Sequence, residues 1–181
     1  MPDAIVLLKA DHKEAERLFK RFESLGPGAR KSKRVLVDEI IVELSRHAAV
    51  EEQVFYPAIR EALPAIDDDV LEGLEEHHIV KWTLSELQDL SPDEERFDAK
   101  VTVLIESVRH HVKEEETEMF PAVRAALGRK RLLEIGTQLE QAKKVVPSRP
   151  HPKAPDTPPG NLVVGNGAGL AERARKAFSR L

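Results

Sequence analysis

The chain has 181 residues, with 28 Lys and Arg against 32 Asp and Glu, and its formal net charge is −4. This length suits one domain around a single core. The charge balance argues against nucleic acid as the main partner. The absence of cysteine excludes disulfides, iron–sulfur clusters and thiolate zinc sites. No apolar run approaches the roughly 18–20 residues of a transmembrane segment, and the N-terminus lacks a basic signal-peptide start, so we expect a soluble, cytoplasmic protein.

Helical patterns dominate the chain and strand patterns are absent, which predicts an all-α fold. The N-terminal segment ends at Gly26-Pro27-Gly28, and Pro57 and Pro121 should each kink a helix because proline lacks a backbone donor. Ser91-Pro92-Asp93-Glu94 has the form of a capping box that starts a helix. Five helical stretches are predicted, at residues 3–25, 33–63, 67–90, 91–128 and 130–145.

An internal repeat relates the two halves of this helical region. The segment HAAVEEQVFYPAIREAL at residues 47–63 returns as HVKEEETEMFPAVRAAL at residues 111–127. A similar offset places His12 over His77. The repeat predicts a duplicated helical hairpin, and two such hairpins form an up-down four-helix bundle. The fifth helix is expected to brace this bundle.

The composition changes after residue 146. We therefore assign residues 1–146 to the bundle, residues 147–169 to a Pro- and Gly-rich linker, and residues 170–181 to a short basic amphipathic tail helix. The tail helix could contact a partner protein or another surface. The alternative is a tail that folds weakly, or packs onto its own bundle, because three helical turns alone are marginal in water.

Helical geometry, at 100° per residue, indicates which polar side chains face the core. Each of the four bundle helices directs one histidine towards its apolar stripe, and two helices add a glutamate one turn later. His78, His110 and Glu52 fall off these faces. The six core-facing residues are His12, His47, Glu51, His77, His111 and Glu115.

A lone core histidine is usually structural, but six converging ionisable groups are too costly to bury without a neutralising partner. Imidazole and carboxylate without thiolate suit iron or manganese, with zinc as a further option. Two glutamates on facing helices can each bridge two ions. Four imidazole bonds, four carboxylate bonds and an oxo or hydroxo bridge leave about two of twelve positions open on two octahedral ions. Open positions are typical of reactive metal sites.

The order His12, His47-x-x-x-Glu51, His77, His111-x-x-x-Glu115 resembles the hemerythrin-like (HHE cation-binding) domain over about residues 3–145. This resemblance implies a non-haem di-iron centre, with these six residues as the iron ligands. Oxygen-carrying members have a further histidine one turn after the third-helix ligand, where this chain has Lys81, so the bacterial branch is the better match.

Four further residues are candidates for additional ligands: Glu16, Glu52, Tyr56 and His78. A ferritin-like carboxylate site is the rival class. It needs two Glu-x-x-His motifs on separate helices. This chain has one, Glu75-x-x-His78, and its histidine lies off the core-facing line.

The sequence therefore predicts a cytoplasmic di-iron protein that binds or reacts with dioxygen, peroxide or nitric oxide, with a role in oxidative stress. The ions would be oxo- or hydroxo-bridged iron, with manganese or zinc less favoured. Two alternatives remain open: an iron- or redox-responsive regulatory module, and a catalase-like peroxide-degrading enzyme. No catalytic residue beyond the metal ligands can be assigned.

Overall fold

A computed structural model describes residues 2–161 of the chain, and every regular element in that range is helical. The predicted tail helix at residues 170–181 lies outside the described residues. The elements, in chain order, are α1 (Ala4–Glu23), α2 (Arg30–Val50), the π-helical turn η1 (Glu51–Phe55), α3 (Tyr56–Ala62), the 3₁₀ turn η2 (Pro64–Ile66), α4 (Asp67–Asp89), α5 (Phe97–Glu114), the π-helical turn η3 (Glu115–Met119) and α6 (Phe120–Ala142).

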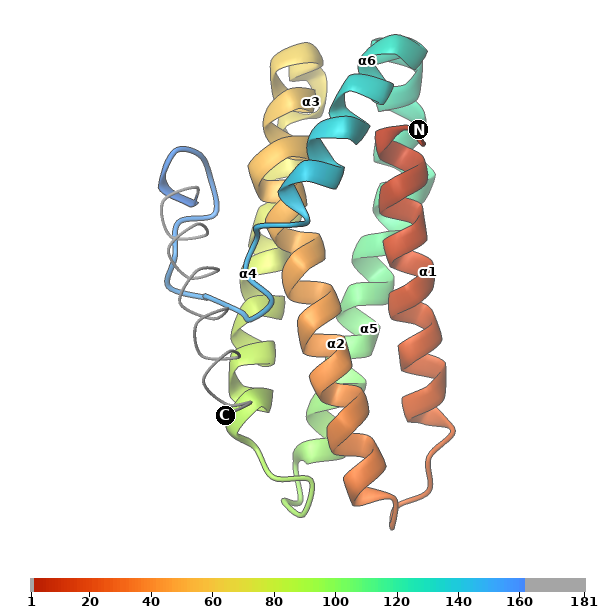
Figure 1. The fold of residues 1–181 in the computed structure, drawn as a ribbon, viewed down its shortest axis with the longest axis vertical. Coiled ribbons are helices and arrows are strands. Elements are labelled where there is room, and N and C mark those ends of the chain that lie inside the picture. The colour runs from red at the N-terminus through yellow and green to blue at the C-terminus, as the bar shows by residue number, and fades with distance from the viewer. Residues whose placement is uncertain (1, 162–181) are drawn as a thin grey trace.

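Four long helices, α1, α2, α4 and α5, lie side by side as an up-down bundle (Figure 1). The loops that join α1 to α2 and α4 to α5 lie at the same end of the bundle, so each pair forms a hairpin. The chain passes from the first hairpin to the second at the opposite end, through α3 and η2. The predicted four-helix bundle is confirmed.

Most helix boundaries follow from local chemistry. The Asp3 carboxylate accepts a hydrogen bond from the Val6 backbone N–H at 2.9 Å and caps α1. The predicted helix start at Ser91 is wrong by six residues, since α5 begins at Phe97. Glu94 does accept from the backbone N–H of Ser91 at 3.1 Å, so the capping-box contact forms, but it closes a turn that precedes the helix.

The two predicted proline kinks take the form of π-helical turns. In η1 the Tyr56 backbone N–H bonds to the Glu51 carbonyl, five residues back, and in η3 the Phe120 N–H bonds to the Glu115 carbonyl in the same way. The turn η1 ends at Phe55, two residues before Pro57, and η3 ends at Met119, two residues before Pro121. A π turn accommodates one extra residue without breaking the helix, and such turns are frequent at functional sites.

The bracing helix forms the C-terminal part of α6. Gly128 lies inside α6 with φ 67° and ψ 170°, so it breaks the element into two helical pieces, as the sequence predicted. A glycine tolerates this left-handed φ because it has no Cβ. The second piece packs against the start of α1, where a Cβ on Gly136 would lie 2.8 Å from the Pro2 carbonyl oxygen.

The apolar core is divided into two clusters. One cluster, at the end of the bundle that carries α3 and α6, includes Leu8, Phe55 and Leu74. The other cluster, at the end with the α1–α2 and α4–α5 loops, includes Phe19 and Leu84. The buried histidines and glutamates lie between these clusters. The bundle therefore encloses a polar layer between two apolar ones.

Part of the predicted linker lies against the bundle. Asn161 is buried, its side-chain amide donates to the Glu52 carbonyl at 3.3 Å, and its own carbonyl accepts from Gln53 at 3.4 Å. These contacts join residues 147–161 to the π turn η1. Among residues 2–161, no helix is both long and apolar enough to cross a lipid bilayer.

Candidate metal centre

The six residues singled out from the sequence converge in the polar layer of the bundle. His12 comes from α1, His47 from α2, His77 from α4 and His111 from α5, and all four rings are buried. Glu51 and Glu115 are the first residues of the two π turns, and their carboxylates are exposed by only 0% and 2%. The structure therefore brings together all six residues.

The imidazoles meet in two pairs through their Nε2 atoms. His12 and His47 approach to 3.2 Å, and His77 and His111 also approach to 3.2 Å. Glu51 joins the pairs, because its Oε2 lies 3.1 Å from His47 Nε2 and 3.3 Å from His77 Nε2. The result is two groups of potential ligand atoms that share one carboxylate.

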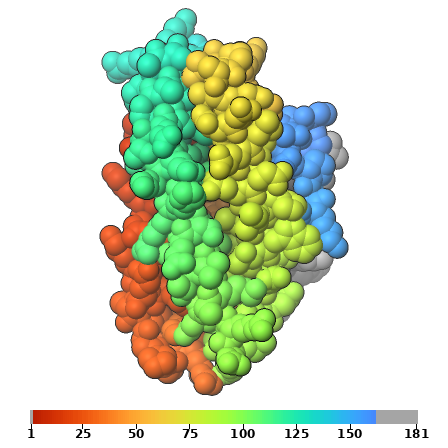
Figure 2. Space-filling view, turned by 180° about the vertical axis from the view of Figure 1, so that it is seen from behind, coloured from red at the N-terminus to blue at the C-terminus, as the bar shows by residue number. Residues whose placement is uncertain are grey.

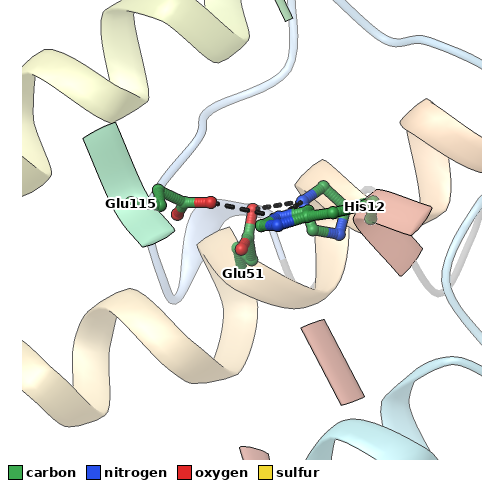
Figure 3. A group of neighbouring side chains, drawn as sticks. His12, Glu51 and Glu115 are labelled. Atoms are coloured by element: carbon green, nitrogen blue, oxygen red, sulfur yellow. Dashed lines mark hydrogen bonds and ion pairs between the residues drawn. The ribbon is translucent and has the colours of Figure 1, made fainter. Parts of the chain in front are cut away.

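Glu115 completes the centre from the opposite side (Figure 3). Its Oε2 lies 3.2 Å from His12 Nε2 and 3.6 Å from His111 Nε2, so it too contacts one imidazole of each pair. The Glu51 and Glu115 carboxylates thus each contact one imidazole of each pair.

The spacing of these atoms fits bound cations. Two donor atoms held at right angles on one ion, by bonds of about 2.0–2.2 Å, lie about 3 Å apart. The distances between the paired nitrogens, and between nitrogens and carboxylate oxygens, run from 3.1 to 3.6 Å. The buried carboxylates also favour a bound cation, because both Glu51 oxygens and Glu115 Oε2 lack a hydrogen-bond partner among the described residues. Buried carboxylate oxygens without hydrogen bonds are costly, and a cation would satisfy them.

Each ring also contacts a carboxylate through its outer nitrogen, Nδ1. Such outer contacts fix the tautomer and orientation of metal-binding histidines and raise their basicity. The four contacts are His12 with Glu116 at 2.9 Å, His47 with Asp11 at 3.5 Å, His77 with Glu52 at 3.2 Å, and His111 with Glu76 at 2.7 Å.

Three of these four outer carboxylates carry a lysine partner as well. Glu116 pairs with Lys9, Glu52 with Lys81, and Asp11 with Lys143. Glu52 is buried, although α-helical geometry placed it at the rim. The wide turn η1 lets the adjacent Glu51 and Glu52 both face inwards.

The electrostatics of the layer favour positive charge at its centre. Burial opposes protonation of His47, yet the Glu51 charge and the Asp11 hydrogen bond raise its pKa well above the usual range. For His77, burial is again outweighed by Glu51 and Glu52, which raise the pKa to about 9. Burial opposes ionisation of Glu51, but the neighbouring imidazoles hold its pKa well below normal. Glu51 thus favours its ionised form, and His47 and His77 favour their protonated forms beside it.

Tyr56 is a neighbour that the sequence suggested only as an additional ligand. Its hydroxyl donates to Glu115 Oε1 at 3.0 Å, and its ring stacks on His77 with centroids 5.5 Å apart. Burial, with the charges of Glu115 and Glu51, raises the Tyr56 pKa well above 10, so the hydroxyl keeps its proton. Gly73 makes room for this hydroxyl, since a Cβ there would lie 3.0 Å from it. No periodic pattern in the sequence indicated the role of Gly73.

The other candidate ligands face elsewhere. Glu16 pairs with Arg109 at 2.9 Å, and His78 accepts a hydrogen bond from the exposed Trp82 at 3.0 Å. Lys81, which stands where oxygen carriers have another histidine, directs its ammonium to Glu52 at 2.8 Å. None of these three approaches the paired Nε2 atoms.

Together, the bundle and its layer of imidazoles and carboxylates define a helical metal-binding domain. The family model described as "Hemerythrin HHE cation binding domain" matches residues 3–123. The chain therefore belongs to the hemerythrin HHE cation-binding domain family.

Individual relatives agree with this assignment. An uncharacterized hemerythrin-like protein of Schizosaccharomyces pombe is 31% identical over 144 residues, which are 79% of this chain and 71% of that protein. A solved structure of an HHE cation-binding domain-containing protein from Mycobacterium kansasii matches with a TM-score of 0.65 and 25% identity, over 80% of this chain and 89% of that one. A protein named DNA nickase from a Nostoc species is 26% identical over 143 residues, and the match spans 79% of this chain but only 40% of that protein.

Proposed function

We propose that this chain holds two iron ions in the candidate centre and that the centre binds, or reacts with, a small oxidant such as dioxygen, peroxide or nitric oxide. The observation that carries the proposal is the arrangement of the imidazoles as two pairs, with Glu51 Oε2 in contact with one nitrogen of each pair. One ion would be held by His12 and His47 and a second by His77 and His111, and Glu51 and Glu115 would supply the carboxylate oxygens.

The donor set supports iron as the metal. Imidazole nitrogens and carboxylate oxygens, without thiolate, suit iron or manganese, and zinc would also accept these donors. When bound, iron would supply redox chemistry and open coordination positions, which a purely structural ion does not need. The surrounding chain would fix the ligands in place.

The protein's own residues prepare the site for such a ligand. The four outer carboxylates orient the imidazole rings, and Lys81 supports His77 through Glu52. Phe120 stacks on His12 with centroids 5.8 Å apart, and Phe55 packs against Phe120. These apolar walls limit access by water. The Tyr56 hydroxyl places a proton beside Glu115.

The proposed partner is therefore a small molecule. The net charge of −4 favours neither nucleic acid nor an anionic membrane. The name of the Nostoc relative does not change this proposal, because the matched region is a minor part of that longer protein. A cytoplasmic location and a response to oxidative stress remain expectations from the sequence.

Metal analysis combined with optical spectroscopy tests the proposal. Protein produced with iron supplied should contain about two iron ions per chain and absorb in the near ultraviolet, without haem bands. Protein that contains a single zinc ion and no iron would contradict the dinuclear assignment.

Addition of peroxide then separates the functional classes. Rapid oxygen evolution over many turnovers would assign the chain to the peroxide-degrading enzymes. A stable stoichiometric change in the spectrum would instead indicate a carrier or sensor. An unchanged spectrum with each of peroxide, dioxygen and nitric oxide would contradict a small-oxidant function.

A further inference from the structure

An acidic hollow lies between α4 and the α5–η3 segment, on the face of the molecule seen in Figure 2. Its volume is about 70 Å³, and its inner wall includes His111 and Glu115 of the candidate centre. Among the described residues, its lining contains no lysine or arginine. The carboxylates that line it, besides Glu115, are Asp69, Glu72, Glu76, Glu114 and Glu118. A recess with walls of one charge raises the local concentration of ions of the opposite charge.

Three residues on this side of the bundle form a further group of potential metal ligands. Glu76, His110 and Glu114 each offer one donor atom, and these atoms lie within 4.8 Å of one another. His110 and Glu114 form a His-x-x-x-Glu pair, with His110 Nε2 3.3 Å from Glu114 Oε1. This pair precedes His111 and Glu115 by one residue, so the α5–η3 segment carries one such pair facing outwards and one facing inwards.

Glu76 connects the outer group with the candidate centre. Its Oε2 accepts a hydrogen bond from His111 Nδ1 at 2.7 Å. A carboxylate has two oxygens, so Glu76 can keep this contact and offer Oε1 to a cation. Of the four outer carboxylates in the described part of the chain, Glu76 alone has no lysine partner. Its partners among these contacts are therefore histidines, and no lysine of the described residues occupies its Oε1.

The inner end of the hollow also points to a cation. Glu115 lines it with a carboxylate that is exposed by only 2%, and Glu115 Oε2 has no hydrogen-bond partner among the described residues. A cation that crossed the hollow would thus reach a buried carboxylate oxygen that lies 3.2 Å from His12 Nε2 and 3.6 Å from His111 Nε2. The acidic lining and this buried oxygen are separate observations, and both favour the passage of positive ions.

We propose that Glu76, His110 and Glu114 form a third metal site, which captures a divalent first-row cation at the surface and passes it through the acidic hollow to His111 and Glu115. The identity of the cation as Fe²⁺ rests on the proposed function. One imidazole and two carboxylates suit such an ion. The exposure of His110 and Glu114, 63% and 42% of their side chains, leaves room for water ligands and for rapid exchange.

Uptake of Fe²⁺ by the full-length apoprotein without oxygen tests the capture role. His110→Gln and Glu114→Gln should each slow uptake on the order of tenfold, because local capture and electrostatic steering are lost. The final metal content should not change, because the inner ligands remain. The matched controls are His78→Gln and Glu106→Gln, which alter a histidine and an exposed glutamate outside the hollow. Equal uptake rates in the wild type and all four variants would overturn the proposal.

Mn²⁺ binding tests the third site independently of the buried centre. In the double variant Glu51→Ala/Glu115→Ala, one Mn²⁺ should still bind, and adding His110→Gln should abolish that binding. Failure of the double variant to bind Mn²⁺ would overturn the third site. If this site binds while the wild type fails to hold two irons, the proposed function fails and the third site stands.

Discussion

The hydrogen bond from Tyr56 to Glu115 should stabilise the metal-free bundle. In Tyr56→Phe the ring is kept, so its stacking on His77 and its packing volume change little. What is lost is the donor at 3.0 Å from Glu115 Oε1. The variant leaves Glu115 Oε1 without its donor, so the imidazole contacts of Oε2, at 3.2 Å from His12 and 3.6 Å from His111, are what remain for this buried carboxylate.

A hydrogen bond to a charged group contributes about 1.5–3 kcal/mol to the free energy of unfolding. For a chain of this size, each kcal/mol shifts Tm by roughly 2–4 °C. We therefore expect Tyr56→Phe to lower the Tm of the apoprotein by about 3–12 °C. In the metal-loaded protein the loss should be smaller, because bound ions would neutralise the carboxylate.

Thermal and denaturant unfolding, followed by circular dichroism with and without a chelator, measures both effects. Ser45→Ala is the matched control, because Ser45 carries a buried hydroxyl that has no hydrogen-bond partner in the described structure. Removing that hydroxyl breaks no hydrogen bond and should not destabilise the protein. If Tyr56→Phe and Ser45→Ala were equally stable as apoproteins, the Tyr56 hydrogen bond would have no stabilising role.

Four further outcomes are expected. Glu51→Ala should lose most of the bound metal while Glu52→Ala loses less, and elemental analysis showing equal loss would contradict the assignment of Glu51 as the bridging residue. Gly136→Ala should destabilise the bundle by about 1–3 kcal/mol in denaturant unfolding, because the new Cβ meets backbone at 2.8 Å; unchanged stability would mean that α6 does not press on α1. Arg109→Gln should cost about 0.2–1 kcal/mol at neutral pH, and the cost should vanish as pH falls below the lowered pKa values of its two glutamate partners on α1, since those carboxylates then lose their charge; a cost that persists at low pH would point to packing instead. Deleting residues 147–181 should leave the metal content unchanged, and loss of iron in this variant would place the segment within the centre.

The sequence was sufficient for the fold and for the convergence of the six residues because both follow from helical periodicity. Apolar stripes recur along each helix, and the histidines fall within these stripes, so a calculation of 100° per residue was enough to group them. The internal repeat added the pairing of hairpins. Short-range capping contacts were also readable, although the start of α5 was not, because the Ser91–Glu94 contact closes a turn instead.

What the sequence could not show depends on departures from ideal geometry or on contacts between distant segments. The π turns shift the helical phase, and this is why Glu52 is buried although ideal geometry placed it at the rim. Helical periodicity does not distinguish the outer carboxylates Asp11 and Glu76 from other acidic residues. Only the tertiary structure places them beside His47 and His111. Proline after the repeated glutamates was the one available signal for the wide turns.

The division of the core into two apolar clusters has a consequence for folding cooperativity. A domain with one continuous core tends to unfold as a single unit, whereas regions joined by few apolar contacts open separately. Here Leu8 belongs to one cluster and Ala15 to the other, and His12 lies between them on the same helix. Ions held by ligands from all four helices would join the two regions, and binding energy would add directly to the folding energy. Without metal, only the contacts between imidazoles and carboxylates would join the two regions through this layer. We therefore expect each end of the bundle to open separately, which amide hydrogen exchange would register as two separate sets of protection.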